Sequence, residues 1–259
     1  MAETRKHLSG TGILLGSVLA VLLAVSAQAQ VSQEFHRTVP LTANGRVSLD
    51  NINGNVEVTG WDRNEVQINA VKQARDQQRL DEAQIEVESG SDYVKIHTQY
   101  PHNRNNNNPA SVHYTLYVPQ NAQLDHLSLV NGSLTVQKVS GEVDANLVNG
   151  KAHIRDLTGE ASISSLNGTI EANYASLNNV REIKLKSVNG AIELGLPASP
   201  NADVKASTVN GAIKSDFPLT VQGSFAGRHI SGTLGSGGTH IDLSNVNGSI
   251  HLGSGSGNL

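Results

Sequence analysis

The sequence predicts an all-β fold: a parallel β-solenoid of stacked coils, of the β-helix type, preceded by a β-rich capping sheet. The first observation is a repeated Asn-Gly pair whose copies between Asn131 and Asn210 lie 18, 18, 22 and 21 residues apart. The second is that apolar residues recur at fixed distances after each Asn, with the two-residue period of a strand that buries one face. One such coil buries too little apolar surface to offset the ordering of its backbone, so several coils must stack.

The Asn-Gly pairs are predicted to be corners of the coils. Glycine supplies the positive φ that we expect at a corner, and asparagine tolerates the left-handed region or bonds its own backbone. One outlying pair, Asn53-Gly54, precedes the repeat. The predicted corner residues within the repeat are Asn131, Gly132, Asn149, Gly150, Asn167, Gly168, Asn189, Gly190, Asn210, Gly211, Asn247 and Gly248.

An apolar residue stands directly before each Asn, and we interpret it as a side chain that points into the core while the chain turns. These residues are Ile52, Val130, Val148, Leu166, Val188, Val209 and Val246. The alternative is a two-residue hairpin, for which Asn-Gly between apolar runs is a strong signal. A hairpin would also place apolar residues two positions before Asn, where most copies are polar: Asn51, Ser165, Ser187, Thr208 and Asn245. We therefore expect solenoid corners.

The chain divides into four segments. Residues 1–29 have the basic start, the short apolar run and the Ala27-Gln28-Ala29 site of a secretory signal peptide, with a retained membrane anchor as the alternative. Residues 30–126 are β-rich, include one short predicted helix at residues 76–84, and are expected to cap the first edge of the solenoid. Residues 127–252 form the repeat, and residues 253–259 are expected to be a flexible tail.

Composition limits the partners and the compartment. The net charge is −4 with both signs interspersed, so we expect no nucleic-acid partner and no polybasic contact with lipid headgroups. The chain has no cysteine, and hence neither a disulfide framework nor a thiol for lipid attachment. After signal cleavage we expect no transmembrane span, and a periplasmic or extracellular location; the oligomeric state stays open.

The segment NINGNVEVTGWDRNEVQI, the strand VHYTLYVP and the repeats VNGSLTV, LNGTIEA, VNGAIEL, VNGAIKS and VNGSIHL resemble the "putative adhesin" family of bacterial β-strand-repeat proteins, a domain of unknown function. The resemblance covers residues 31–252. It implies a right-handed β-solenoid in an exported or cell-envelope protein. No catalytic residues are ascribed to that family, so the resemblance supplies none.

Two outward rows of the solenoid are candidates for a function. The row four residues after Asn brings together His153, Glu171 and Glu193 if the coils stack in register, and its full membership is Glu57, Thr135, His153, Glu171, Glu193, Lys214 and His251. A second row three residues before Asn is small and flat: Ser128, Asn146, Ser164, Lys186, Ser207 and Ser244. Both rows are also compatible with ordinary solvent-facing strands; the second could dock a glycan or another β edge.

None of the remaining sequence motifs indicates a particular chemical reaction. The histidines lack metal-ligand spacing, with His97 and His102 flanking a turn; the serines lack a nucleophile elbow; and Gly-rich runs do not precede a helix. Trp61 is interpreted as a packing anchor under the first sheet, with a sugar-stacking platform as the alternative. We therefore expect no catalytic residues, cofactor or metal.

The sequence thus favours a non-enzymatic envelope protein, an adhesin or scaffold that presents a flat solenoid surface to a glycan or protein partner. The alternatives are a glycan-active β-helix enzyme that uses His153, Glu171 and Glu193, and an envelope-stress sensor that binds a ligand.

Overall fold

The computed structural model describes residues 30–101, 109–219, 221–222 and 228–255. The predicted signal peptide and most of the predicted tail therefore lie outside the described residues. The described chain is all-β apart from one short helix, α1 (Gln77–Glu82), which confirms the fold class at that level. The side chain of Asp76 accepts a hydrogen bond from the Arg79 amide and so caps the helix start.

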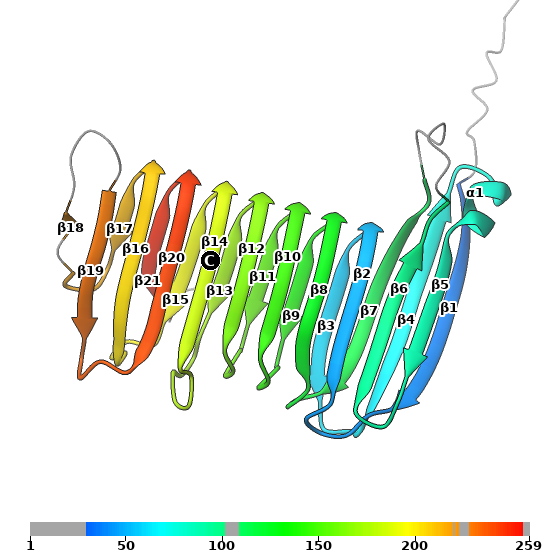
Figure 1. Cartoon of the computed structure of the whole chain (residues 1–259), viewed down its shortest axis with the longest axis horizontal. Coiled ribbons are helices and arrows are strands. Elements are labelled where there is room, and N and C mark those ends of the chain that lie inside the picture. The colour runs from blue at the N-terminus through cyan, green and yellow to red at the C-terminus, as the bar shows by residue number, and fades with distance from the viewer. Residues whose placement is uncertain (1–29, 102–108, 220, 223–227, 256–259) are drawn as a thin grey trace, which may run out of the picture.

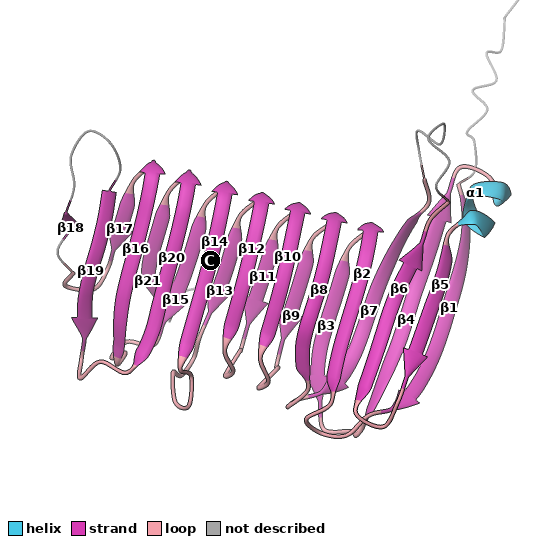
Figure 2. Ribbon diagram, in the orientation of Figure 1, coloured by secondary structure: helices cyan, strands magenta, loops and turns pink. Residues whose placement is uncertain are grey.

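Two long sheets lie face to face (Figures 1 and 2). The spatial order of sheet A is β1 (Val31–Pro40), β4 (Glu65–Ala74), β7 (Ser111–Pro119), β3 (Val56–Trp61), β9 (Leu134–Gln137), β11 (Ala152–Arg155), β13 (Ile170–Asn173), β15 (Ile192–Leu196), β21 (Ile250–Ser254) and β17 (Ile213–Ser215). The spatial order of sheet B is β5 (Gln84–Ser89), β6 (Tyr93–Gln99), β2 (Arg46–Asn53), β8 (Gln123–Asn131), β10 (Val143–Asn149), β12 (Ala161–Asn167), β14 (Glu182–Asn189), β20 (Thr239–Asn247), β16 (Ala202–Asn210), β19 (Arg228–Leu234) and β18 (Val221–Gln222).

The repeat forms coils, each with one strand in sheet B, an Asn-Gly corner and one strand in sheet A. Neighbouring coils pair in parallel and in register, so that Ala145 lies beside Ile163 in sheet B and Ile154 beside Ala172 in sheet A. Inward side chains of both sheets make one continuous apolar core between them. The stacking predicted from the sequence is therefore confirmed, whereas the right-handed sense of the winding stays a prediction.

The residue before each Asn does not point into the core, and this part of the sequence interpretation is wrong. In β10, Val143, Ala145 and Leu147 are buried and alternate with outward side chains, so Val148 points outward and is 37% exposed. Leu166, in the same position of the next coil, is 45% exposed. The two-residue alternation thus continues to the end of the strand, and the chain turns only at Asn, Gly and the residue after them.

Polar residues two positions before Asn are therefore the inward ones, and several bond the corner of the next coil. Ser187 Oγ donates to the carbonyl of Gly168 at 3.3 Å, and Thr208 Oγ1 donates to the carbonyl of Gly248 at 3.1 Å. These bonds satisfy polar atoms that would otherwise be costly to bury.

Positive φ explains only some of the corners. Gly54, Gly190 and Gly248 have φ of 118°, 156° and 150°, but Gly168 is not in this region, and none of the corner asparagines has positive φ. At Gly168 the constraint is the close approach of the neighbouring coil, because a Cβ atom would stand 1.8 Å from the carbonyl oxygen of Gly150. The corners need glycine chiefly because stacked backbones touch there.

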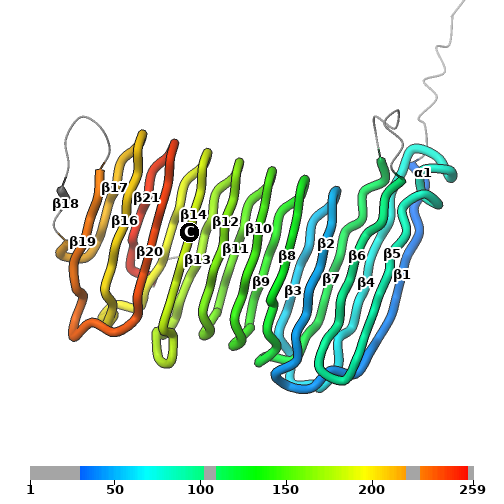
Figure 3. Tube along the Cα trace, in the orientation of Figure 1, coloured from blue at the N-terminus to red at the C-terminus, as the bar shows by residue number. Residues whose placement is uncertain are grey.

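The spatial order of the coils differs from their order in the chain at both ends (Figure 3). The last coil, β20–β21, lies between β14–β15 and β16–β17, which are consecutive in the sequence. Likewise the first coil, β2–β3, lies between β6–β7 and β8–β9. Residues 30–126 thus extend the same two sheets as the repeat. Antiparallel strands occupy the outer positions at both ends of sheet B and at the β1 end of sheet A, whereas β17 pairs in parallel at the other end of sheet A.

Candidate binding faces

The outer face of sheet A carries one straight row of polar side chains, which we call the polar row. Strand pairing places one member on each of its ten strands, and each member is partly or fully exposed. In spatial order the polar row is His36, Asn69, Thr115, Glu57, Thr135, His153, Glu171, Glu193, His251 and Lys214. The sequence had identified seven of these residues, and the structure brings all seven together.

The predicted neighbours His153, Glu171 and Glu193 occupy three consecutive strands in the middle of the polar row. His153 Nδ1 lies 2.9 Å from Glu171 Oε2, although the two groups lack the geometry of a hydrogen bond. About a quarter of each of these two side chains is exposed (27% and 26%). The pair is therefore partly exposed on the outer face of sheet A, and the Nδ1 atom of His153 is itself buried.

Further along the polar row, His251 Nε2 lies 3.3 Å from Asp216 Oδ1, a carboxylate from the segment after β17. The pKa of Asp216 is lowered by this histidine and by the Ser254 amide, which donates to Oδ2. Both contacts favour the ionised form of Asp216 beside the end of the polar row.

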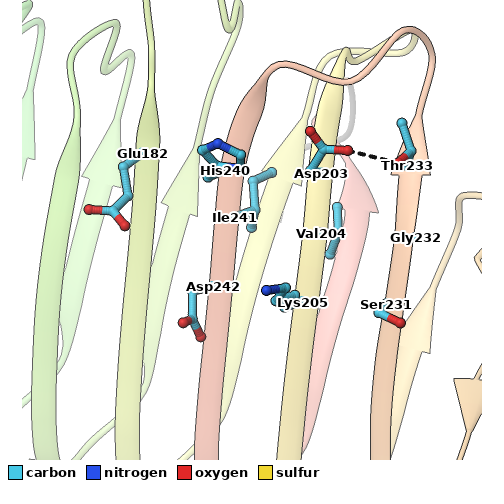
Figure 4. Close-up of a pocket in the computed structure, with 10 residues that line it drawn as sticks. All are labelled: Glu182, Asp203, Val204, Lys205, Ser231, Gly232, Thr233, His240, Ile241 and Asp242. Carbon is cyan, nitrogen blue, oxygen red and sulfur yellow. Dashed lines mark hydrogen bonds between the residues drawn. The ribbon is translucent and has the colours of Figure 1, made fainter.

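A shallow depression of about 380 Å³ lies on the outer face of sheet B (Figure 4). Glu182, His240, Asp203 and Thr233 line its upper side from four neighbouring strands, in the row that strand pairing defines. Thr233 donates to Asp203 at 2.7 Å and Gly238 donates from its amide, and these bonds lower the pKa of Asp203. This depression could not be predicted from the sequence, because β19 pairs antiparallel with β16 outside the repeat pattern.

The side of sheet B next to the corners carries a row of exposed apolar side chains, which we call the apolar stripe. In spatial order along the stack it consists of Ile52, Val130, Val148, Leu166, Val188, Val246 and Val209. Six of its seven members are among the exposed large hydrophobic residues of the described chain, with exposures from 37% to 57%. The sequence showed these residues but assigned them to the core.

The corner asparagines form a hydrogen-bonded ladder beside the apolar stripe. Along the stack, the corner asparagines lie in the order Asn210, Asn247, Asn189, Asn167, Asn149, Asn131 and Asn53. The side-chain Nδ2 of each of the first six donates a hydrogen bond of 2.9 Å to the Oδ1 of the next asparagine in this order. Because all the amides point the same way, each bond polarises the next. This ladder, and not a left-handed backbone, explains why the repeat has asparagine at its corners.

Trp61 lies on the outer face of sheet A and not under the sheet, which corrects the expected location. Its ring stacks on Tyr117 with centroids 5.4 Å apart, Arg63 lies over the ring at 4.8 Å, and its indole N–H donates to the Glu65 carbonyl at 2.9 Å. With two neighbours over its ring and its only donor used, Trp61 is a packing residue of the outer face.

Two histidines that are distant in sequence share a carboxylate on sheet B. His126 Nε2 and His97 Nδ1 lie 3.3 Å and 3.8 Å from the two oxygens of Asp50, because β6 and β8 flank β2. Among the described residues, no group of three or more histidines or carboxylates has an arrangement that could hold a metal ion. The described part of the chain also has no helix that is long and apolar enough to span a membrane.

The fold and these faces define a class: an all-β protein built from two stacked-coil sheets with broad outer faces. Residues 144–253 match the Toastrack DUF4097 family, so the chain contains a Toastrack DUF4097 domain, and the family expected from the sequence is confirmed. A comparison with curated proteins finds no match.

Three of the solved structures that match this chain are bacterial proteins of low sequence identity. A "putative cell adhesion protein" from Clostridium sporogenes is 13% identical, with a TM-score of 0.42, over 86% of this chain and 100% of that one. A "putative adhesin" from Bacteroides fragilis is 13% identical, with a TM-score of 0.40, over 86% and 97%. A "putative lipid binding protein" from Parabacteroides distasonis is 12% identical, with a TM-score of 0.29, over 85% and 96%.

Proposed function

We propose that this protein is an exported, non-enzymatic protein of the cell envelope that binds glycan on the outer face of sheet A. The polar row carries the proposal. It is about 43 Å long, from nine strand spacings of ~4.8 Å, and it combines acceptors such as Glu57 with the donor Lys214 and with groups that do both. An extended chain rich in hydroxyl groups is the ligand that such a flat row of hydrogen-bonding side chains fits.

Binding to a glycan array, followed by titration with the glycans found, tests this proposal. We expect a variant with Glu171→Ala and Glu193→Ala to bind at least about tenfold more weakly, because it loses two acceptors from the middle of the polar row. A matched control, Asp125→Ala with Glu142→Ala, removes two exposed carboxylates from the outer face of sheet B and should leave binding unchanged. If the glycan array shows no binding but a pull-down retains an envelope protein, the partner is a protein and not a glycan. If neither assay finds a partner, the proposal is refuted.

The proposed export rests on the signal-peptide pattern of residues 1–29. Sequencing the N-terminus of protein recovered from the envelope or the medium checks it. We expect the mature chain to begin near Gln30, whereas a chain that begins at Met1 or Ala2 would contradict cleavage.

A glycan-active enzyme is the second candidate, and the 2.9 Å approach of His153 to Glu171 favours it. A carboxyl group paired with an imidazole can move protons at a glycosidic bond. The test is turnover of a bound glycan, followed by reducing-end assay. Enzymatic function requires turnover that Glu171→Gln abolishes; unchanged turnover in this variant would remove the candidate.

A further inference from the structure

The apolar stripe is unlike every other outward row that the coils present. The next outward row of sheet B holds Asp50, Ser128, Asn146, Ser164, Lys186, Ser244 and Ser207, and the polar row of sheet A is polar on all ten strands. Only the position before Asn is apolar in every coil although it faces outward. A continuous exposed apolar row on a folded surface marks a site of interaction.

We propose that a second copy of this chain covers the apolar stripe, through face-to-face packing of the two B sheets about a twofold axis at β12. The seven coils that carry Asn-Gly are arranged symmetrically around this strand: β10 and β14 flank it, then β8 and β20, then β2 and β16. An axis parallel to β12 therefore places each strand of one copy opposite its counterpart in the other, and places stripe on stripe. Such a contact is isologous and closes as a dimer.

Two pairs of charged residues on sheet B have opposite signs across this axis. Asp144 on β10 is the counterpart of Lys184 on β14, so each faces the other in the dimer, and the contact occurs twice. Further out, Arg46 on β2 faces Asp203 on β16 in the same way. On β12 itself, which meets its own copy, the outward residues are the uncharged Ser162, Ser164 and Leu166. Opposite charges therefore meet beside the axis at Asp144 and Lys184, and no charge within β12 meets its own copy.

The exception is an acidic row at the other end of the strands, where Glu142 would face Glu182 and Glu160 would face its own copy. Glu160 is bonded to Arg181 at 2.6 Å, and Glu182 lies 3.1 Å from Lys184, so both have a cation in their own chain. This row lies roughly 20 Å from the apolar stripe, at ~3.3 Å per residue. The contact is therefore expected to be tightest on the side of the stripe.

The available area is sufficient for a stable pair. Seven strands at ~4.8 Å and the three outward rows nearest the corners span a flat area of roughly 600 Å² on each copy. Together the two copies bury about 1,200 Å², the lower end of the range for specific protein interfaces. Packed sheets keep their strand directions within about 30° of each other, and the near-parallel strands of this arrangement fall within that range.

Analytical ultracentrifugation of the purified chain at a series of concentrations and salt levels tests the proposal. We expect a monomer–dimer equilibrium that weakens with salt, and we expect Leu166→Asp, which places two carboxylates against each other on the axis, to be monomeric. The matched control is Thr135→Asp, an outward strand residue on sheet A, which should still dimerise. A chain that is monomeric up to about 100 µM, or a Leu166→Asp variant that dimerises like the parent, would overturn the proposal.

A charge exchange tests the register. Asp144→Lys alone and Lys184→Asp alone should each raise the dimer dissociation constant about tenfold or more, because each creates two like-charge contacts. The variant with both changes should recover the affinity of the parent; continued weakness there would refute the axis at β12. Glycan binding by the polar row should persist in monomeric Leu166→Asp, so the two proposals fail independently.

Discussion

Replacement of Gly168 by alanine tests the physical reason for glycine at the corners. The added Cβ would stand 1.8 Å from the Gly150 oxygen, so the two coils must separate by about 1.2 Å to reach the 3.0 Å that real Cβ contacts respect. Two backbone bonds cross this corner at 3.0 Å, from the Gly150 amide to the Asn167 carbonyl and from the Ala152 amide to the Thr169 carbonyl. The Asn167 side chain adds a third bond, to Asn149.

Loss of these three bonds, at about 1 kcal/mol each, predicts a destabilisation of roughly 2–4 kcal/mol. Urea denaturation followed by far-ultraviolet circular dichroism measures it. The control is Gly253→Ala in β21, where the nearest atoms to a new Cβ are side-chain atoms at 3.3 Å or more and the expected change is within about 0.5 kcal/mol. Equal stability of the two variants would mean that close approach of the coils does not constrain the corner.

Three further changes test the ladder, the core and the order of the coils. Asn167→Ala removes two hydrogen bonds from the asparagine ladder and should lower the free energy of unfolding by about 1–2 kcal/mol. The control Thr169→Ala, in the same corner, should change this free energy little. The same urea titration measures both variants, and equal effects would argue against the ladder. Burial raises the pKa of Tyr114 to about 12, so the neutral phenol stabilises the fold below about pH 10, and this contribution is lost as pH rises toward 12. The urea midpoint should therefore fall less steeply over this pH range in Tyr114→Phe than in the parent. Parallel curves for the two proteins would contradict the assignment. Deletion of residues 235–259 should abolish the cooperative transition of the whole repeat, because β14 and β16 both lose their shared neighbour β20; a transition kept at the parent midpoint would show that the order of coils is wrong.

The sequence predicted the repeat, the in-register stacking and the neighbours His153 and Glu171, because each depends only on spacing along the chain. It misplaced Val148 and its equivalents, since a continuous two-residue alternation and a corner with an inward valine fit the same apolar pattern. The outward position is the one that keeps Leu147 in the core.

The order of the coils could not be predicted from the repeat, because coils with equivalent inward residues can stack in any order. Two unequal spacings carried the signal: Asn53 and Asn131 are 78 residues apart, and Asn210 and Asn247 are 37 apart, although each coil needs about 18 to 22. The intervening segments form the outer coils and antiparallel edge strands at the two ends. The pairing of His97 and His126 with Asp50 follows from the same rearrangement.

The position of the last coil inside the stack sets when the molecule can fold. The coils cannot stack in the order of their synthesis, because the β16–β17 coil pairs with β20 and β21, which follow it in the sequence. Contacts between residues so distant in sequence also slow folding. The middle of the stack therefore closes only after β20 and β21 have been synthesised, because these strands join the β14–β15 coil to the β16–β17 coil.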